Sequence, residues 1–228
     1  MGVERYGRLM RVVIAGGHGQ IAMRLEKLLV ARGDTAVGIV RNPAHMRDLG
    51  AIGADPVVCD LESASVTEVA AQLHGADAVV FAAGAGPGSG AARKDTVDRG
   101  AAVLCADAAE QAGVRRYLMI SAMGADQEPS PGTDPVFASY LRAKGAADAD
   151  LVSHSGLDWI ILRPGRLTDN PGTGLIRLGR HTGRGMVPRD DVAAVLLALL
   201  DISASGLTLE LVAGDTPVDE AVRAVASA

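Results

Sequence analysis

Short apolar runs alternate with longer helical segments along most of the chain, and this alternation constrains the fold more than any other feature. Strands that alternate with helices of this length form right-handed βαβ units and a parallel sheet. The runs are continuously apolar, so both faces of the sheet should be covered. We therefore expect an α/β fold with a Rossmann-like, doubly wound parallel sheet in a three-layer α/β/α arrangement. The strand-type runs occupy residues 11–15, 35–40, 56–59, 77–83, 116–122 and 158–165.

The length of 228 residues suits one ordinary α/β domain. We expect a single domain over residues 1–228, with residues 1–9 as a loose N-terminal extension. After the last apolar run the sequence becomes rich in Gly, Pro and Arg, and residues 164–228 are expected to cover the substrate. Within that segment, residues 189–201 predict one strong helix and residues 206–214 predict a strand. One long helix is expected earlier, across residues 95–113.

Composition narrows the class of protein. The net charge of −5 argues against a general binder of nucleic acid or anionic membranes. Cys59 and Cys105 form no CxxC motif or Cys/His cluster, so no metal site is predicted, and they are expected to be small hydrophobic residues in a reducing cytoplasm. The longest apolar run, residues 192–200, is far shorter than the roughly 20 residues that span a bilayer, and no secretion signal is visible. The sequence leaves the oligomeric state open between monomer and homodimer.

A glycine-rich turn joins the first expected strand to the first helix. In "VVIAGGHGQIA", Gly16, Gly19 and Ala22 have a G-x-x-G-x-x-A spacing. Glycine allows a tight turn that approaches a pyrophosphate, and a helix N-terminus offers free N–H groups to an anion. The alternative is a tight turn without a ligand, with His18 as an exposed filler. The residues expected to hold the nucleotide here are Gly16, Gly17, His18, Gly19, Gln20 and Ile21.

The second and third strands bear on the choice of dinucleotide. A carboxylate after the second strand would bind the ribose 2′-OH of NAD, but this strand is followed by Arg41, which suits the 2′-phosphate of NADP(H). An exposed arginine at a strand end is the alternative. Asp60, with Leu61 beside it, follows the third strand and is expected at the adenine amine; a helix N-cap is the alternative for Asp60.

The ordered motifs resemble the short-chain dehydrogenase/reductase superfamily, in particular its atypical, epimerase-like branch. The resemblance implies that Ala82, Ala83 and Gly84 line the nucleotide ribose and that Pro164 and Gly165 lie beside the nicotinamide amide. It also places Asp98 where related enzymes carry an active-site Asn. The matching segments run over residues 12–193 and are "AGGHGQIA", "VRNP", "CDLE", "FAAGAG", "VDRGA", "MISAMG", "YLRAK", "LRPGRLTDNPGTG" and "RDDVA".

A candidate acid/base group follows from spacing. Tyr140 and Lys144 are four residues apart in a helical segment, so they share one face. A neighbouring ammonium should lower the pKa of the phenol toward neutrality, which suits a general acid or base, and Lys144 is also expected at the cofactor. Ser121 ends the fifth expected strand, where its hydroxyl could hold the same substrate oxygen. A Tyr and a Lys on an ordinary amphipathic helix are the alternative.

These features predict a cytoplasmic NADP(H)-dependent oxidoreductase or epimerase that acts on a small molecule. A nucleotide-binding redox sensor would need no Tyr140, and a flavin or quinone reductase would need little acid/base help. A run of arginines between residues 163 and 189 faces either an anionic substrate or solvent.

Overall fold

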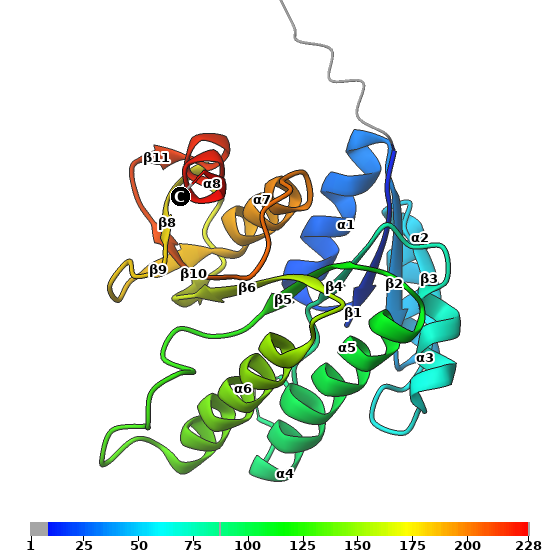
Figure 1. Cartoon of the computed structure of the whole chain (residues 1–228), viewed down its shortest axis with the longest axis horizontal. Helices are drawn as coiled ribbons and strands as arrows, with labels where there is room; N and C mark the ends of the chain where they lie inside the picture. The colour runs from blue at the N-terminus through cyan, green and yellow to red at the C-terminus, as the bar shows by residue number, and fades with distance from the viewer. Residues whose placement is uncertain (1–8, 87, 228) are drawn as a thin grey trace, which may run out of the picture.

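The computed structural model describes residues 9–86 and 88–227. Its centre is a nine-stranded sheet in the order β11-β8-β10-β6-β5-β4-β1-β2-β3, and the strands from β10 to β3 are parallel. This order confirms the Rossmann-like α/β prediction (Figure 1). Successive strands are added toward one edge of the sheet from β1 to β3 and toward the other edge from β4 to β6. The switch between β1 and β4 is the place where such folds bind ligands. The parallel strands are β1 (Arg11–Ala15), β2 (Thr35–Val40), β3 (Asp55–Val58), β4 (Ala78–Phe81), β5 (Arg116–Ile120), β6 (Asp158–Pro164) and β10 (Leu207–Ala213).

Two apolar cores, one on each face, hold the sheet between its helices. Val12 and Ile14 of β1 point into one core, and Val13 and Ala15 point into the other. All four side chains are fully buried. A strand that is buried on both faces needs no polar alternation, which is why these runs are continuously apolar in the sequence.

Helices α1, α7 and α8 cover one face of the sheet, and α3, α5 and α6 cover the other (Figure 1). The expected long helix at residues 95–113 is divided: a π-helical segment precedes α5, so that Asp98 lies in a wide turn of backbone. The helices are α1 (Gln20–Arg32), η1 (Pro43–His45), α2 (Met46–Ala51), α3 (Val66–Leu73), α4 (Ala91–Arg93), the π-helix η2 (Lys94–Ala101), α5 (Ala102–Gln111), α6 (Pro135–Ser153), α7 (Arg189–Leu200) and α8 (Val218–Ala226).

The segment after β6 has more strand than its composition suggests. β8 (Leu175–Gly179) runs antiparallel to β10, and β11 (Thr216–Pro217) pairs antiparallel with β8. A separate parallel ribbon joins β7 (Arg166–Thr168) to β9 (Met186–Pro188). None of the helices in the described part of the chain is long and apolar enough to cross a membrane. The expected extension at residues 1–9 lies, except for Leu9, outside the described residues.

Candidate nucleotide and substrate site

The glycine-rich turn packs too tightly at Gly16 and Gly17 for any other residue. Gly16 has a φ of +83°, and a Cβ there would lie 2.6 Å from the Cα of Ala83. A Cβ at Gly17 would lie 2.7 Å from the Cα of Gly38. The N–H groups of Gly16 and Gly17 both donate to the carbonyl of Ile39, which fixes the turn above β2. The turn therefore lets a ligand approach bare backbone at the carboxyl edge of the sheet.

Helix α1 begins directly after this turn, with Gly19 as its N-cap. No side chain caps the helix, and its first turn, which includes Gln20 and Ile21, contains no acidic residue. The first N–H groups of a helix have no partner within the helix, and the helix dipole makes this end positive. This part of the fold fits a pyrophosphate.

His18 is partly exposed and contacts two residues of the segment after β2. Its Nε2 lies 2.8 Å from Oδ2 of Asp48, and its ring stacks on His45 with 3.6 Å between the ring centroids. The histidine thereby ties the glycine turn to the segment after β2. A contact between His18 and the pyrophosphate stays a prediction.

Arg41 is the residue that was expected to select NADP. Its Nη1 donates to Oε2 of Glu62 at 2.5 Å, and Nη2 of Arg93 donates to the same oxygen at 2.9 Å. Burial pushes the pKa of Glu62 up, but hydrogen bonds from Arg93 and Thr96 and the two arginine charges outweigh it, so the pKa is lowered. Two guanidinium groups thus converge on one anionic oxygen beside the end of β2, and the sequence pattern had pointed to only one of them.

Asp60 shapes the turn that follows β3. Its Oδ1 accepts a hydrogen bond from the N–H of Glu62 at 3.1 Å, and its backbone carbonyl accepts from Ser63 and Ala64. The alternative reading of Asp60 as a helix N-cap is wrong, because Ser65 caps α3 in a capping box with Glu68. Leu61 packs partly buried on the core.

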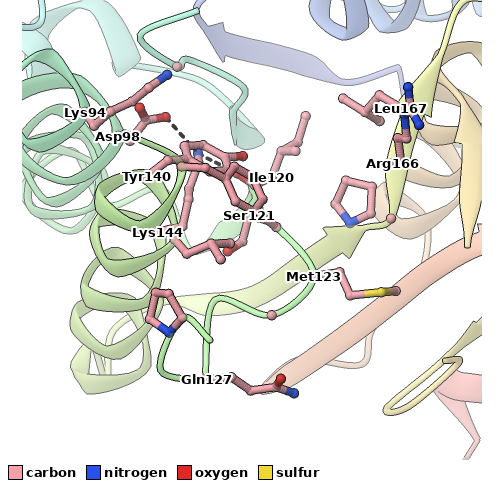
Figure 2. A pocket seen from close by; sticks show the side chains of 18 of the residues that line it. Lys94, Asp98, Ile120, Ser121, Met123, Gln127, Tyr140, Lys144, Arg166 and Leu167 are labelled. Carbon is pink, nitrogen blue, oxygen red and sulfur yellow. Dashed lines mark hydrogen bonds and ion pairs between the residues drawn. The ribbon is translucent and has the colours of Figure 1, made fainter. Parts of the chain in front are cut away.

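A large open cavity of about 1500 Å³ lies along the carboxyl edge of β4, β5 and β6 (Figure 2). It brings together ten of the residues singled out from the sequence. The glycine turn, His18, Gln20, Arg41, Asp60 and Leu61 lie outside its lining, toward β2 and β3. The predicted residues that line it are Ile21, Ala82, Ala83, Gly84, Asp98, Ser121, Tyr140, Lys144, Pro164 and Gly165.

Tyr140 and Lys144 lie on one face of α6, as their spacing predicted. The Lys144 ammonium donates to the carbonyl of Ile120 at 3.0 Å and lies 3.6 Å from Oδ1 of Asp98. Figure 2 shows Tyr140, Asp98 and Ser121 together at this end of the cavity. Lysine therefore links the helix, the end of β5 and the π-helical segment.

The expected lowering of the Tyr140 pKa is wrong for this structure. Burial raises the pKa of the phenol, and the negative charges of Asp98 and Asp148 raise it further. The Lys144 ammonium is engaged by Ile120 and Asp98, so it does not outweigh these effects. Tyr140 is consequently a protonated phenol at neutral pH.

Two buried polar atoms line the cavity: the hydroxyl of Ser121, which contacts the carboxylate of Asp148, and Oδ1 of Asp98, which contacts the Lys144 ammonium at 3.6 Å. Ser121 is 2% exposed and Asp98 is 1% exposed. Buried polar atoms in native proteins are nearly always paired. Both residues line the cavity, where a bound ligand can add to these contacts.

An ionic network of Asp148, Arg163 and Asp126 behind the cavity was not predicted from the sequence. Asp148, one turn after Lys144 on α6, accepts from Nε of Arg163 at 2.9 Å, and Nη1 of Arg163 lies 2.9 Å from Asp126. Burial raises the pKa of Asp148, while the Arg163 and Lys144 charges oppose it. The i, i+4, i+8 spacing of Tyr140, Lys144 and Asp148 was the available signal. This network fixes α6 against β6.

Glu26 is a second residue that the sequence pattern did not single out. It lies on α1 beneath the glycine turn, is fully buried, and neither carboxylate oxygen has a partner among the described residues. A Cβ at Gly17 would lie 2.9 Å from its Oε1. Burial raises the pKa of Glu26 to about 8.

The chain matches the model of a family described as NAD(P)H-binding over residues 16–202. It belongs to the NAD(P)H-binding family. The match begins at the first glycine of the turn, and it bears out the resemblance to the atypical short-chain dehydrogenase/reductases.

Relatives of this NAD(P)H-binding chain cover nearly its whole length. It is 36% identical over 216 residues to a Bacillus subtilis protein named "Uncharacterized sugar epimerase YhfK". This match covers 94% of this chain and 99% of the relative. A solved structure named "Putative NAD-dependent epimerase/dehydratase from Bacillus halodurans" is 34% identical, with a TM-score of 0.86 over 94% of this chain and 99% of that one. A Veillonella parvula short-chain dehydrogenase/reductase solved with NADP shares the fold, at 17% identity and a TM-score of 0.71 over 93% of this chain and 99% of that one. The chain is thus an oxidoreductase- or epimerase-like member of the NAD(P)H-binding family.

Proposed function

We propose that this chain is an NADP(H)-dependent oxidoreductase or epimerase that transfers a hydride to or from a small molecule. The observation that carries the proposal is the meeting of Ser121, Tyr140, Lys144 and Asp98 in one cavity with Pro164 and Gly165. These residues come from four separate parts of the chain. Their convergence is hard to explain as the chance composition of an amphipathic helix.

The nucleotide would lie along the carboxyl edge of the sheet. Gly16, Gly17 and Gly19 with the N-terminus of α1 would hold the pyrophosphate, and Arg41 with Arg93 would hold a 2′-phosphate. Support for NADP over NAD comes from the two guanidinium groups that already surround one anionic oxygen of Glu62. A phosphate offers such oxygens in the geometry that arginine prefers.

When bound, the nicotinamide supplies or accepts the hydride. The protein's own task is to hold the substrate oxygen and to move a proton at it. Tyr140 has a raised pKa, so it is protonated and suits donation to a carbonyl oxygen during reduction. Ser121 can hold the same oxygen, because it lines the cavity beside Tyr140. Lys144 is a positioning residue that is held by Asp98 and Ile120.

Two measurements test this function. Calorimetric titration of the purified chain with NADPH and NADH should show binding of both, with tighter binding of NADPH. A screen of aldehydes, ketones, quinones and flavins, followed by loss of NADPH absorbance, should then find a carbonyl substrate.

The outcomes of the screen separate the alternatives. Nucleotide binding without any turnover would favour the redox sensor. Turnover of flavins or quinones alone, unaffected by loss of the Tyr140 hydroxyl, would favour the reductase that needs no acid/base group. Absence of nucleotide binding would overturn all three.

A further inference from the structure

The wall of the cavity across from Tyr140 is formed by the ribbon of β7 and β9 (Figure 2). Arg166 pairs in register with Met186, and the N–H of Arg166 donates to the carbonyl of Gly185 at 2.9 Å. Arg184 lies two residues before Met186, in a bend that precedes β9. All three side chains line the cavity.

The backbones of this ribbon approach one another closely. A Cβ at Gly165 would collide with the carbonyl oxygen of Gly185, and a Cβ at Gly185 would lie 2.9 Å from the Cβ of Val212. Glycine at both positions therefore allows β7 and β9 to pack against β10. Arg166 therefore lies in a well-packed strand, and Arg184 directly precedes the closely packed Gly185.

The acidic and basic side chains that line the cavity differ in whether the protein provides them with a hydrogen-bond or ion-pair partner. Each acidic residue in the lining is engaged by the protein: Asp98 by Lys144, Glu128 by Arg142, Asp134 by the N–H of Phe137, and Glu210 by Thr182. The side chains of Arg166, Arg184 and His181 have no hydrogen-bond or ion-pair partner within residues 9–86 and 88–227. The remaining arginines of the same segment differ, because Arg163 and Arg189 are ion-paired and Arg177 and Arg180 lie outside the lining. One wall of the cavity therefore carries positively charged side chains that a bound anion could pair with.

Exposed apolar side chains line the same cavity as these cations. Val136, Phe137 and Met186 are 40%, 51% and 56% exposed, and all three line the cavity. Leu167 and Met123 extend the same surface (Figure 2). Large exposed apolar side chains at a cavity favour a ligand with an apolar body, with a few polar groups to orient it.

We propose that the substrate of this site is an oxyanion with an apolar body, whose carboxylate or phosphate is bound by Arg166 and Arg184. The assignment rests on the proposed function, since it names the class of small molecule that the same cavity takes. The arginines hold the anionic end against the ribbon, and the reacting carbonyl extends toward Ser121 and Tyr140. Arginine suits this task because its planar donors match either oxyanion in a bidentate manner.

Binding of unreactive probes tests the subsite without turnover. The protein, saturated with the nicotinamide nucleotide that it binds best, is titrated by calorimetry with 2-naphthoate, 2-naphthamide and 2-naphthyl phosphate. A charged hydrogen bond changes affinity by roughly ten- to a hundredfold, so at least one of the two anions should bind about tenfold or more tightly than the amide. The ratio between the two anions then distinguishes a carboxylate from a phosphate.

Paired substitutions locate the effect. The Arg166→Gln/Arg184→Gln double variant should lose the preference for the anion while its affinity for the amide stays unchanged. The Arg177→Gln/Arg180→Gln variant removes the same charge from the same segment outside the cavity and should keep the preference. Melting temperatures of both variants show whether the fold is retained.

Several results would overturn the inference: equal affinity for acid and amide, binding of none of the probes, a preference that survives the double variant, or an equal loss in the control pair. These results are separate from failure of the proposed function. A protein that selects the anion but reduces no carbonyl keeps the oxyanion subsite and loses the hydride-transfer assignment.

Discussion

The side-chain nitrogen of Lys144 lies 3.6 Å from Oδ1 of Asp98, and both side chains are at most 5% exposed. Burial lowers the pKa of Lys144, while the charges of Asp98 and Asp148 oppose that effect. Asp98 also raises the pKa of Tyr140. The carboxylate of Asp98, in a π-helical turn, therefore influences the pKa values of both Lys144 and Tyr140.

Replacing Asp98 by Asn should lower the pKa of Tyr140. A phenol donates only while it is protonated, so activity is lost as the pH rises through its pKa. Asp98→Asn should therefore move this alkaline limb to lower pH. Tyrosinate absorbance can follow the titration directly, with Tyr140→Phe as the blank for Tyr6 and Tyr117. An unchanged titration curve would contradict the influence of Asp98.

Replacing Tyr140 by Phe should separate chemistry from binding. The ring and its packing remain, but the proton donor is lost, and turnover should fall by about 10²–10⁴. Nucleotide affinity should stay within a few-fold. Tyr117→Phe is the matched control, because Tyr117 is fully buried in the core on the far side of the sheet from α1. A full rate in Tyr140→Phe would remove this residue from the mechanism.

Selection of NADP should depend on both Arg41 and its partner Glu62. Arg41→Ala should lower NADPH affinity by one to two decades, since a charged contact contributes about 1.5–3 kcal/mol, and leave NADH binding nearly unchanged. Glu62→Gln should act oppositely, because it removes the carboxylate that competes with a 2′-phosphate for two guanidinium groups. Calorimetry measures both, and Arg115→Ala, which breaks the exposed pair with Asp158, serves as control. Equal affinities of the unmodified protein for NADPH and NADH would refute NADP selection.

Two substitutions in the glycine turn should have different effects. Gly19 has a φ of −68°, so Gly19→Val should keep the fold and block the approach of pyrophosphate. Gly16→Ala places a Cβ 2.6 Å from the Cα of Ala83 at a positive φ, so the fold itself should lose about 1–3 kcal/mol of stability. Denaturant unfolding and nucleotide titration distinguish the two. Normal NADPH binding by a folded Gly19→Val variant would show that this loop does not hold the nucleotide.

Stability should fall as the pH rises through the window set by Glu26. Its pKa is raised from 4.5 to about 8 in the folded protein, so the native state holds a proton there that the unfolded state releases. The free energy of unfolding therefore decreases from about pH 4.5 to about pH 8. Glu26→Gln should reduce this slope, although the raised pKa of Asp148 leaves part of it. Urea unfolding at a series of pH values gives the slope, and identical slopes would contradict the assignment.

The parallel sheet could be predicted from the sequence because apolar runs and the residues that end them are local features of the chain. Strands β1, β2 and β6 lie where apolar runs end before Gly16, before Arg41 or at Pro164, and the cavity contains Ser121, Tyr140 and Lys144 as expected. The antiparallel β8 and the division of the long helix depend on distant packing. Helical periodicity does not distinguish a π-helical turn from an α-helical one over so few residues.

The pKa shifts and ion pairs of the site were harder to predict from the sequence than the positions of its residues. The spacing of Tyr140 and Lys144 indicated a shared face, but the sign of the pKa shift depends on burial and on Asp98 and Asp148, which only the folded arrangement brings close. Glu62 likewise lies twenty-one residues from Arg41, and their ion pair requires β2 and β3 to be neighbours.

Gly165 and Gly185 pack against β10 directly before the strands β7 and β9, and the segments proposed to bind the nucleotide come before this ribbon in the chain. The proposed nucleotide binding and substrate binding therefore fall to two different stretches of the chain. The residues that we propose to hold the nucleotide precede β7, whereas Arg166, Arg184 and Met186 lie in or directly before the strands of a ribbon that is closely packed at its glycines. Exchange of those side chains leaves the glycine turn, the α6 face and the two cores untouched. A new substrate preference can therefore evolve, or be engineered, on this ribbon without loss of the inherited nucleotide site.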